Sequence, residues 1–148
     1  TKLFSSKARI DEGYNGIANG GYMTRTLELF TGVDYTVVSP LEYKTQHQVY
    51  LNIKSALDSG RPLTTSFKKT QEKGGVNSYG GLVQNHSYAI LGVEDTATIG
   101  KVVTLRNPWG VREFGNDGVN DGVFQMKLDD FDKYAKQIAI PVDYLPGK

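Results

Sequence analysis

The chain contains no cysteine, and this absence limits its chemistry more than any other feature of its composition. Without cysteine, these 148 residues can form no disulfide bond, no thiolate metal site and no thiol nucleophile of their own. An excess of charge of one sign is also lacking, because 17 Lys and Arg residues stand against 16 Asp and Glu residues. A nearly neutral chain has no strong field to attract nucleic acid or an anionic membrane, so neither is a predicted partner.

Long hydrophobic runs are missing as well. No apolar stretch approaches the roughly 18 residues that a membrane-spanning helix requires. The sequence therefore predicts a soluble protein and leaves its cellular location open. A length of 148 residues suits one ordinary domain or part of one, and we expect residues 1–148 to form a single unit.

Hydrophobic periodicity predicts helices mainly in the first half of the chain. The clearest helix covers residues 45–59, where Thr45 and Gln48 have the spacing of a capping box and apolar residues recur every three to four positions. Shorter helices are predicted at about 22–30 and 129–136.

Segments rich in β-branched and aromatic residues predict strands, mainly in the second half. These segments are Leu63–Phe67, Ser87–Val93, Lys101–Arg106, Gly122–Leu128 and Ile138–Val142. Helices followed by strands indicate the α+β class, with an antiparallel sheet flanked by two or three helices.

Two polar residues stand at the ends of neighbouring predicted strands. His86 comes directly before the strand at 87–93, and Asn107 comes directly after the strand at 101–106. If these strands pair as an antiparallel hairpin, both residues lie at the same edge of the sheet. An imidazole that serves a nucleophile needs one ring nitrogen held by an orienting partner, and an asparagine carbonyl can be that partner. We expect the indole of Trp109 to cover this hydrogen bond and exclude water.

Each of these residues also has an ordinary structural explanation. A histidine at a strand end is often a surface residue, an asparagine before proline often stabilises a turn, and a tryptophan often fills a core. Their adjacency is what favours a catalytic site. The other histidine, His47, falls on the polar side of its predicted helix and keeps the ordinary explanation.

The segments His86-Ser87-Tyr88 and Arg106-Asn107-Pro108-Trp109-Gly110 resemble the calpain group of papain-like cysteine peptidases. The resemblance extends over residues 14–32, the helix at 45–59 and residues 121–131. It implies the second lobe of a papain-like catalytic domain, with His86 as the general base and acid, Asn107 as its orienting partner and Trp109 as the shielding ring.

The same resemblance places a substrate-binding edge next to these residues. Gly20 and Gly21 fall where calpains hydrogen-bond an extended peptide, which can approach closely only where no Cβ obstructs it. Asn85 stands at the family's usual glycine position before the histidine. This difference predicts a narrower cleft.

The nucleophile of the family lies in an upstream Gln…Gly-x-Cys-Trp segment that has no counterpart in this chain. The resemblance therefore implies a partner, a Cys-bearing N-terminal lobe on a missing segment or on the second chain of a heterodimer. Together they would form a cysteine endopeptidase that hydrolyses peptides or proteins. The alternative is an inactive calpain-like interaction module that binds an extended peptide without cleaving it.

Calpains also bind calcium through acidic loops in this half, near the positions of Glu113, Asp117 and Asp121. Val123 stands where the family has a glutamate ligand, and Ca²⁺ prefers six to eight oxygen ligands. The sequence leaves calcium binding open but predicts no metal site, and the chemistry itself requires no cofactor.

Overall fold

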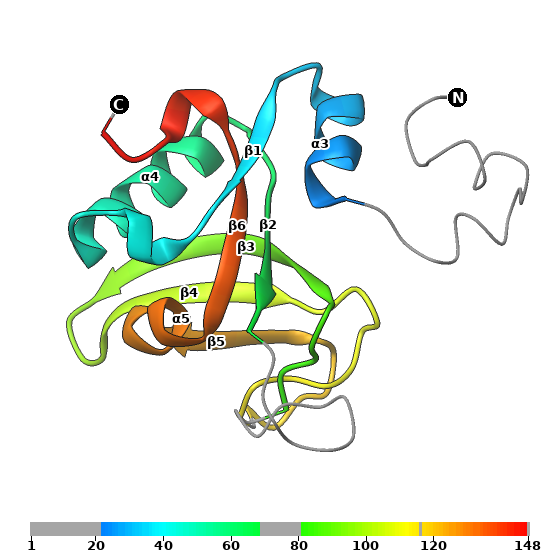
Figure 1. The fold of residues 1–148 in the computed structure, drawn as a ribbon. Coiled ribbons are helices and arrows are strands. Elements are labelled where there is room, and N and C mark those ends of the chain that lie inside the picture. The colour runs from blue at the N-terminus through cyan, green and yellow to red at the C-terminus, as the bar shows by residue number, and fades with distance from the viewer. Residues whose placement is uncertain (1–21, 69–80, 116, 148) are drawn as a thin grey trace, which may run out of the picture.

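A computed structural model describes residues 22–68, 81–115 and 117–147. Within these ranges, six strands form one antiparallel sheet in the order β1-β6-β2-β3-β4-β5. The strands are β1 Tyr35–Val38, β2 Leu63–Phe67, β3 Ser87–Thr96, β4 Gly100–Arg106, β5 Val123–Lys127 and β6 Ala135–Pro141. In Figure 1, β1, β6 and β2 run steeply across the direction of β3, β4 and β5, so the sheet is strongly twisted.

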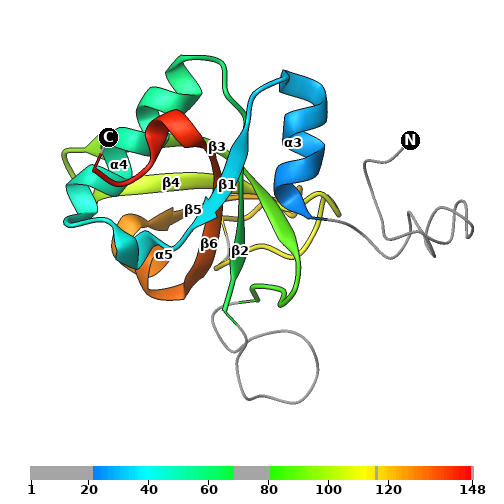
Figure 2. The ribbon, with the colours of Figure 1, turned by 45° about the horizontal axis from the view of Figure 1, so that its top comes forward.

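Three α-helices accompany the sheet within the described ranges: α3 Met23–Thr31, α4 Gln46–Asp58 and α5 Leu128–Tyr134. Two single-turn 3₁₀ helices, η1 Pro40–Glu42 and η2 Val142–Tyr144, complete the elements described. Helices α3 and α4 lie on opposite sides of the β1–β6 pair in both views (Figures 1 and 2). The predicted α+β class is confirmed, and no helix in the described ranges is long and apolar enough to cross a membrane.

Local sequence signals explain where the main helix begins and ends. The Thr45 hydroxyl accepts a hydrogen bond from the Gln48 amide at 3.2 Å, as a capping box requires. The Gln48 side chain, however, accepts from the amide of Lys44 instead of that of Thr45. A complete capping box that was not predicted occurs at Ser39 and Glu42, where it starts η1.

The strands depart from the prediction most at β1 and β6. Strand β1 was not predicted, because it is only four residues long and its partner β6 lies about a hundred positions away in the chain. Strand β6 begins at Ala135 instead of 138, and the helix predicted to reach 136 ends at Tyr134. Pairing of Ala135 with Phe67 of β2 overrides the helix propensity of this segment.

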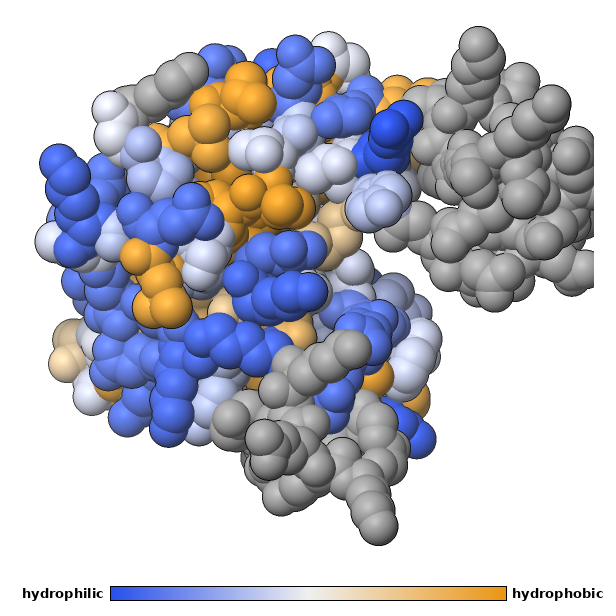
Figure 3. All heavy atoms as spheres, viewed as in Figure 1, coloured by the Kyte–Doolittle hydropathy of each residue, from blue (hydrophilic) through white to orange (hydrophobic). Residues whose placement is uncertain are grey.

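The core contains a group of aromatic rings beneath one end of the sheet. Tyr88 lies 5.2 Å from Phe67 and 5.8 Å from Phe124, both edge to face, measured between ring centroids. Phe67 also contacts Phe131 of α5 at 6.4 Å. Edge-to-face pairs contribute about 1 kcal/mol each beyond the area they bury. These ring contacts hold the beginning of β3 against the core. On the face shown in Figure 3, polar side chains surround a group of apolar ones. Val37 of β1 is among the exposed apolar residues.

The contact between α4 and α5 contains a half-buried carboxylate, Asp132, which supports a prediction about pH. Burial raises the pKa of Asp132 to about 6, the Gln46 side chain opposes this shift, and Asp129 adds to it. The folded state therefore binds this proton more tightly than the unfolded chain, so stability is lost as the pH rises from about 4 to about 6.

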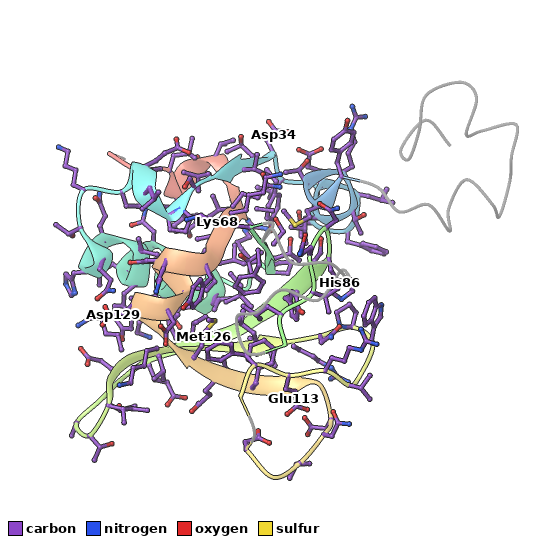
Figure 4. All side chains as sticks on the ribbon, turned by 60° about the horizontal axis from the view of Figure 1, so that its bottom comes forward. Asp34, Lys68, His86, Glu113, Met126 and Asp129 are labelled. Atoms are coloured by element: carbon purple, nitrogen blue, oxygen red, sulfur yellow. The ribbon has the colours of Figure 1, made fainter. Side chains whose placement is uncertain are left out.

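We expect Asp132→Asn to stabilise the protein by roughly 1 kcal/mol at pH 7.5, a value reduced for solvent screening, and by less at pH 4.5. Urea unfolding of both proteins at the two pH values measures the difference. An equal gain at both pH values would contradict the assignment. Figure 4 shows Asp129, which belongs to the same helix as Asp132, and His86 on opposite sides of the molecule.

Candidate active site

The β3–β4 hairpin brings His86 and Asn107 together. Strand β3 starts one residue after His86, strand β4 ends one residue before Asn107, and Ala89 pairs with Arg106 in the antiparallel register. His86 Nε2 lies 2.8 Å from Asn107 Oδ1. The proximity predicted from the two strand ends is therefore present, at the sheet end where Figure 4 shows His86.

Asn107 is completely buried, and its side-chain amide is held from both ends. The Nδ2 group donates to the carbonyl oxygens of Val111 at 2.7 Å and Arg112 at 3.1 Å. Oδ1 accepts from the backbone amide of Trp109 at 3.1 Å as well as facing His86. Two carbonyl acceptors on one side fix the amide orientation, because only the NH₂ group can donate to them.

This orientation also fixes the protonation of the imidazole. Asn107 Oδ1 can only accept, so the nitrogen that faces it, Nε2 of His86, must carry a proton. In the neutral imidazole, Nδ1 is then the unprotonated nitrogen. No described residue hydrogen-bonds Nδ1, which leaves it free to take a proton from a reacting group.

Trp109 lies directly against the imidazole. Its ring centroid is 4.2 Å from that of His86, with the two planes tilted by 42°. Trp109 nevertheless remains 52% exposed. The guanidinium carbon of Arg112 lies 5.6 Å from the centroid of this indole, within cation–π distance.

Tyr88 supports His86 from the protein interior. Its ring meets the imidazole edge to face at 5.1 Å, and its hydroxyl accepts a hydrogen bond from the Val83 amide at 2.9 Å. This bond ties the segment leading into His86 to the core, and burial raises the pKa of the Tyr88 phenol. The alternation of side chains along a strand, which places residues 86 and 88 on one face, was the signal that could have identified this support.

The backbone conformation at position 85 explains why an asparagine can stand there. Its φ angle is +50°, in the left-handed region that glycine favours and that asparagine tolerates better than most residues. A glycine or an asparagine can therefore make this turn into His86. Gly20 and Gly21, the other predicted substrate-binding residues, lie outside the described residues.

The acidic residues of the loop after β4 hydrogen-bond to backbone amides. Glu113 accepts from Gly122 at 2.6 Å, Asp117 from Val119 at 2.9 Å, and Asp121 from Val123 at 2.8 Å. Within the described part of the chain, no group of three or more His, Asp or Glu residues could hold a metal ion.

Close backbone contacts, not predicted from the sequence, hold this loop to the site. The Asn107 amide donates to the Gly122 carbonyl at 2.7 Å, and a Cβ on Gly122 would lie 2.8 Å from Gly110 Cα. A Cβ on Gly81 would lie 2.8 Å from the Glu113 carbonyl oxygen. The many glycines around positions 81 and 122 indicate loops. They do not indicate which glycine allows a close backbone contact.

Comparison with known proteins identifies the family. Residues 3–119 match the sequence model of the calpain family cysteine proteases. The chain belongs to the calpain family of cysteine proteases. The family suspected from the motifs around residues 86 and 107 is thus confirmed, and the geometry described above is that of a calpain-family chain.

Other comparisons are more distant. No curated protein sequence matches this calpain-family chain. Among solved structures, the chain is similar to PepW from Lactobacillus rhamnosis HN001, with 18% sequence identity and a TM-score of 0.43. The similarity covers 65% of this chain and 26% of the PepW chain.

Proposed function

We propose that this chain supplies the histidine and asparagine of a cysteine endopeptidase, and that a partner lobe from outside these residues supplies the nucleophilic cysteine. The observation that carries the proposal is the 2.8 Å contact between His86 Nε2 and Asn107 Oδ1, with the amide orientation fixed by two carbonyl groups. In that arrangement Nδ1 is the imidazole nitrogen that can accept a proton.

In the proposed reaction, His86 Nδ1 takes the proton of the cysteine thiol, and the thiolate attacks the peptide carbonyl carbon. Asn107 Oδ1 stabilises the imidazolium through the Nε2–H bond without adding a full negative charge. His86 then protonates the leaving amine, which departs and leaves an acyl-enzyme. Finally, His86 activates a water molecule that hydrolyses the thioester.

Trp109 and Tyr88 hold the base in place during these steps. The indole at 4.2 Å keeps water from one side of the His86–Asn107 bond, where water would compete for Oδ1. The ring of Tyr88 packs from inside at 5.1 Å. Pre-organisation of this kind means that the imidazole need not be ordered when the nucleophile and substrate arrive.

The test is to co-express the chain with the segment that precedes it in its gene and to measure casein cleavage. We expect cleavage that a thiol-alkylating reagent abolishes and that His86→Ala lowers at least 10³-fold in kcat/KM. The matched control is His47→Ala, which changes the chain's other histidine, exposed on α4, and should leave activity unchanged.

Activity that survives His86→Ala would defeat the assignment. If the preceding segment carries serine or alanine at the cysteine position and no peptide is cleaved, the chain is the alternative peptide-binding module. In that case an extended peptide should still perturb the fluorescence of Trp109, the chain's single tryptophan.

A further inference from the structure

Arg112 has a backbone conformation that is costly for its residue type. Its φ angle is +62°, and Asn85 is the only other non-glycine residue with positive φ in the described ranges. A left-handed conformation costs a residue with a Cβ about 1 kcal/mol, which glycine avoids. The backbone here has a structural role, because the Arg112 carbonyl accepts from Asn107 Nδ2. Glycine could fill that role at lower cost, so the arginine side chain needs a separate explanation.

The side chain of Arg112 presents an unpaired positive charge. It is exposed and lies over the indole of Trp109, with no carboxylate partner among the described residues, whose ion pairs are Lys54–Asp58 and Lys101–Asp95. The nearest acid in sequence, Glu113, bonds the amide of Gly122 instead. An aromatic face holds a guanidinium in place while leaving its N–H groups free to donate.

The location of this charge follows from the proposed function, on which the inference rests. His86 protonates the leaving amine, so the part of the substrate after the scissile bond must pass beside the imidazole. Trp109 contacts that imidazole, and the guanidinium of Arg112 lies over the same indole. Taken end to end, the two centroid distances of 4.2 Å and 5.6 Å limit the separation of the imidazole and the guanidinium to about 10 Å. Two residues of an extended peptide at about 3.4 Å each, together with an acidic side chain, span this distance.

We propose that Arg112 binds a carboxylate on the leaving-group side of the substrate. Two sources share this chemistry: an acidic side chain in the first two residues after the scissile bond, and the C-terminal carboxylate of a short leaving peptide. Guanidinium groups favour carboxylates because their paired N–H donors match the two oxygens. Arg112 is thus a specificity-determining residue for acidic leaving groups.

The first experiment measures binding to the full chain without catalysis. Trp109 is the single tryptophan, so intrinsic fluorescence reports ligands beside it. The probes are Glu-Ala-Ala-amide, Gln-Ala-Ala-amide and Ala-Ala-Ala with a free C-terminus. We expect Glu-Ala-Ala-amide to bind about tenfold more tightly than Gln-Ala-Ala-amide, and Arg112→Gln to abolish the difference. The third probe shows whether a terminal carboxylate is equally effective.

The second experiment compares cleavage by the chain together with its cysteine-bearing segment. Arg112→Gln should lower kcat/KM about tenfold for a substrate with Glu after the scissile bond and leave the Gln substrate unchanged. Arg112→Lys should keep part of the preference. Arg, Lys and Gln all have a Cβ, so the three proteins carry similar strain at this φ angle. Arg106→Gln is the matched control, because Arg106 is also exposed beside Asn107 but is not stacked on Trp109.

The outcomes separate this proposal from the proposed function. Equal losses on the Glu and Gln substrates, or an equal loss of preference in Arg106→Gln, would overturn the role of Arg112. Cleavage with no preference for carboxylates would overturn it too, while leaving the peptidase assignment intact. Absence of cleavage together with Arg112-dependent binding of Glu-Ala-Ala-amide would reject the peptidase assignment and support the carboxylate site.

Discussion

Replacing Asn107 by aspartate is expected to destabilise the folded chain by about 3 kcal/mol at pH 7.5, although the two side chains have the same shape. The amide group of Asn107 is fully buried and donates to the carbonyls of Val111 at 2.7 Å and Arg112 at 3.1 Å. An aspartate would place a negatively charged oxygen against these two carbonyl oxygens with no donor between them. The structure therefore gives a reason for asparagine that is independent of catalysis.

Unfolding in urea at pH 7.5 and pH 5.0 measures this effect. A buried carboxylate facing carbonyl oxygens has a raised pKa, so its penalty is greatest at high pH and should shrink as the pH falls and the group takes up a proton. Asn120→Asp is the control, since the exposed Asn120 uses its Oδ1 to accept from the Arg112 amide, and aspartate can also accept. If Asn107→Asp is as stable as the parent, the Asn107 Nδ2 group does not donate to these two carbonyls.

Gly122→Ala is expected to have a similarly large effect, about 3–5 kcal/mol, for a different reason. A Cβ at this position would lie 2.8 Å from Gly110 Cα and 2.9 Å from the Asn107 carbonyl oxygen. Both are backbone atoms, which cannot move aside as a flexible side chain can. Their displacement would shift Asn107 and the turn that carries Trp109, so we expect loss of the His86–Trp109 contact together with the loss of stability.

Gly115→Ala separates crowding from backbone strain. Gly115 lies in the same loop with a similar φ, +75° against +83° for Gly122, but its Cβ would have no atom within 4 Å. We expect this control to cost about 1 kcal/mol, the price of a left-handed conformation alone. Urea unfolding measures stability, and Trp109 fluorescence measures the site. If the two alanine variants lose the same stability, the close backbone contact at Gly122 has no energetic importance.

The pairing of His86 with Asn107 was predictable because it depends on local structure. The two residues bracket one hairpin, and any antiparallel pairing of its strands brings the ends together. Helix α4 was predictable for a similar reason, since its cap at Thr45 and its buried residues Val49 and Ile53 lie within a few turns of one another. The assignment of Gly20 and Gly21 to substrate binding stays a prediction.

Other features could not be predicted because they depend on residues far apart in the chain. Strand β1 pairs with β6, and Tyr35 lies opposite Pro141. Ala135 belongs to β6 because it pairs with Phe67 of β2. The residues next to it in the sequence favour a helix. The need for glycine at position 122 depends on the close approach of the Gly110 and Asn107 backbones, which the sequence does not reveal.

The sequence by itself determined the family, the α+β class and the residues that meet at one end of the hairpin, because motifs and short-range periodicity carry that information. The tertiary structure alone decided which oxygen and which nitrogen face each other, and so which imidazole nitrogen is free. It also placed the charge of Arg112 over Trp109. The physical reason is that hydrogen-bond direction depends on carbonyl groups whose positions are set by loop backbone angles, and residue identity alone does not specify those angles.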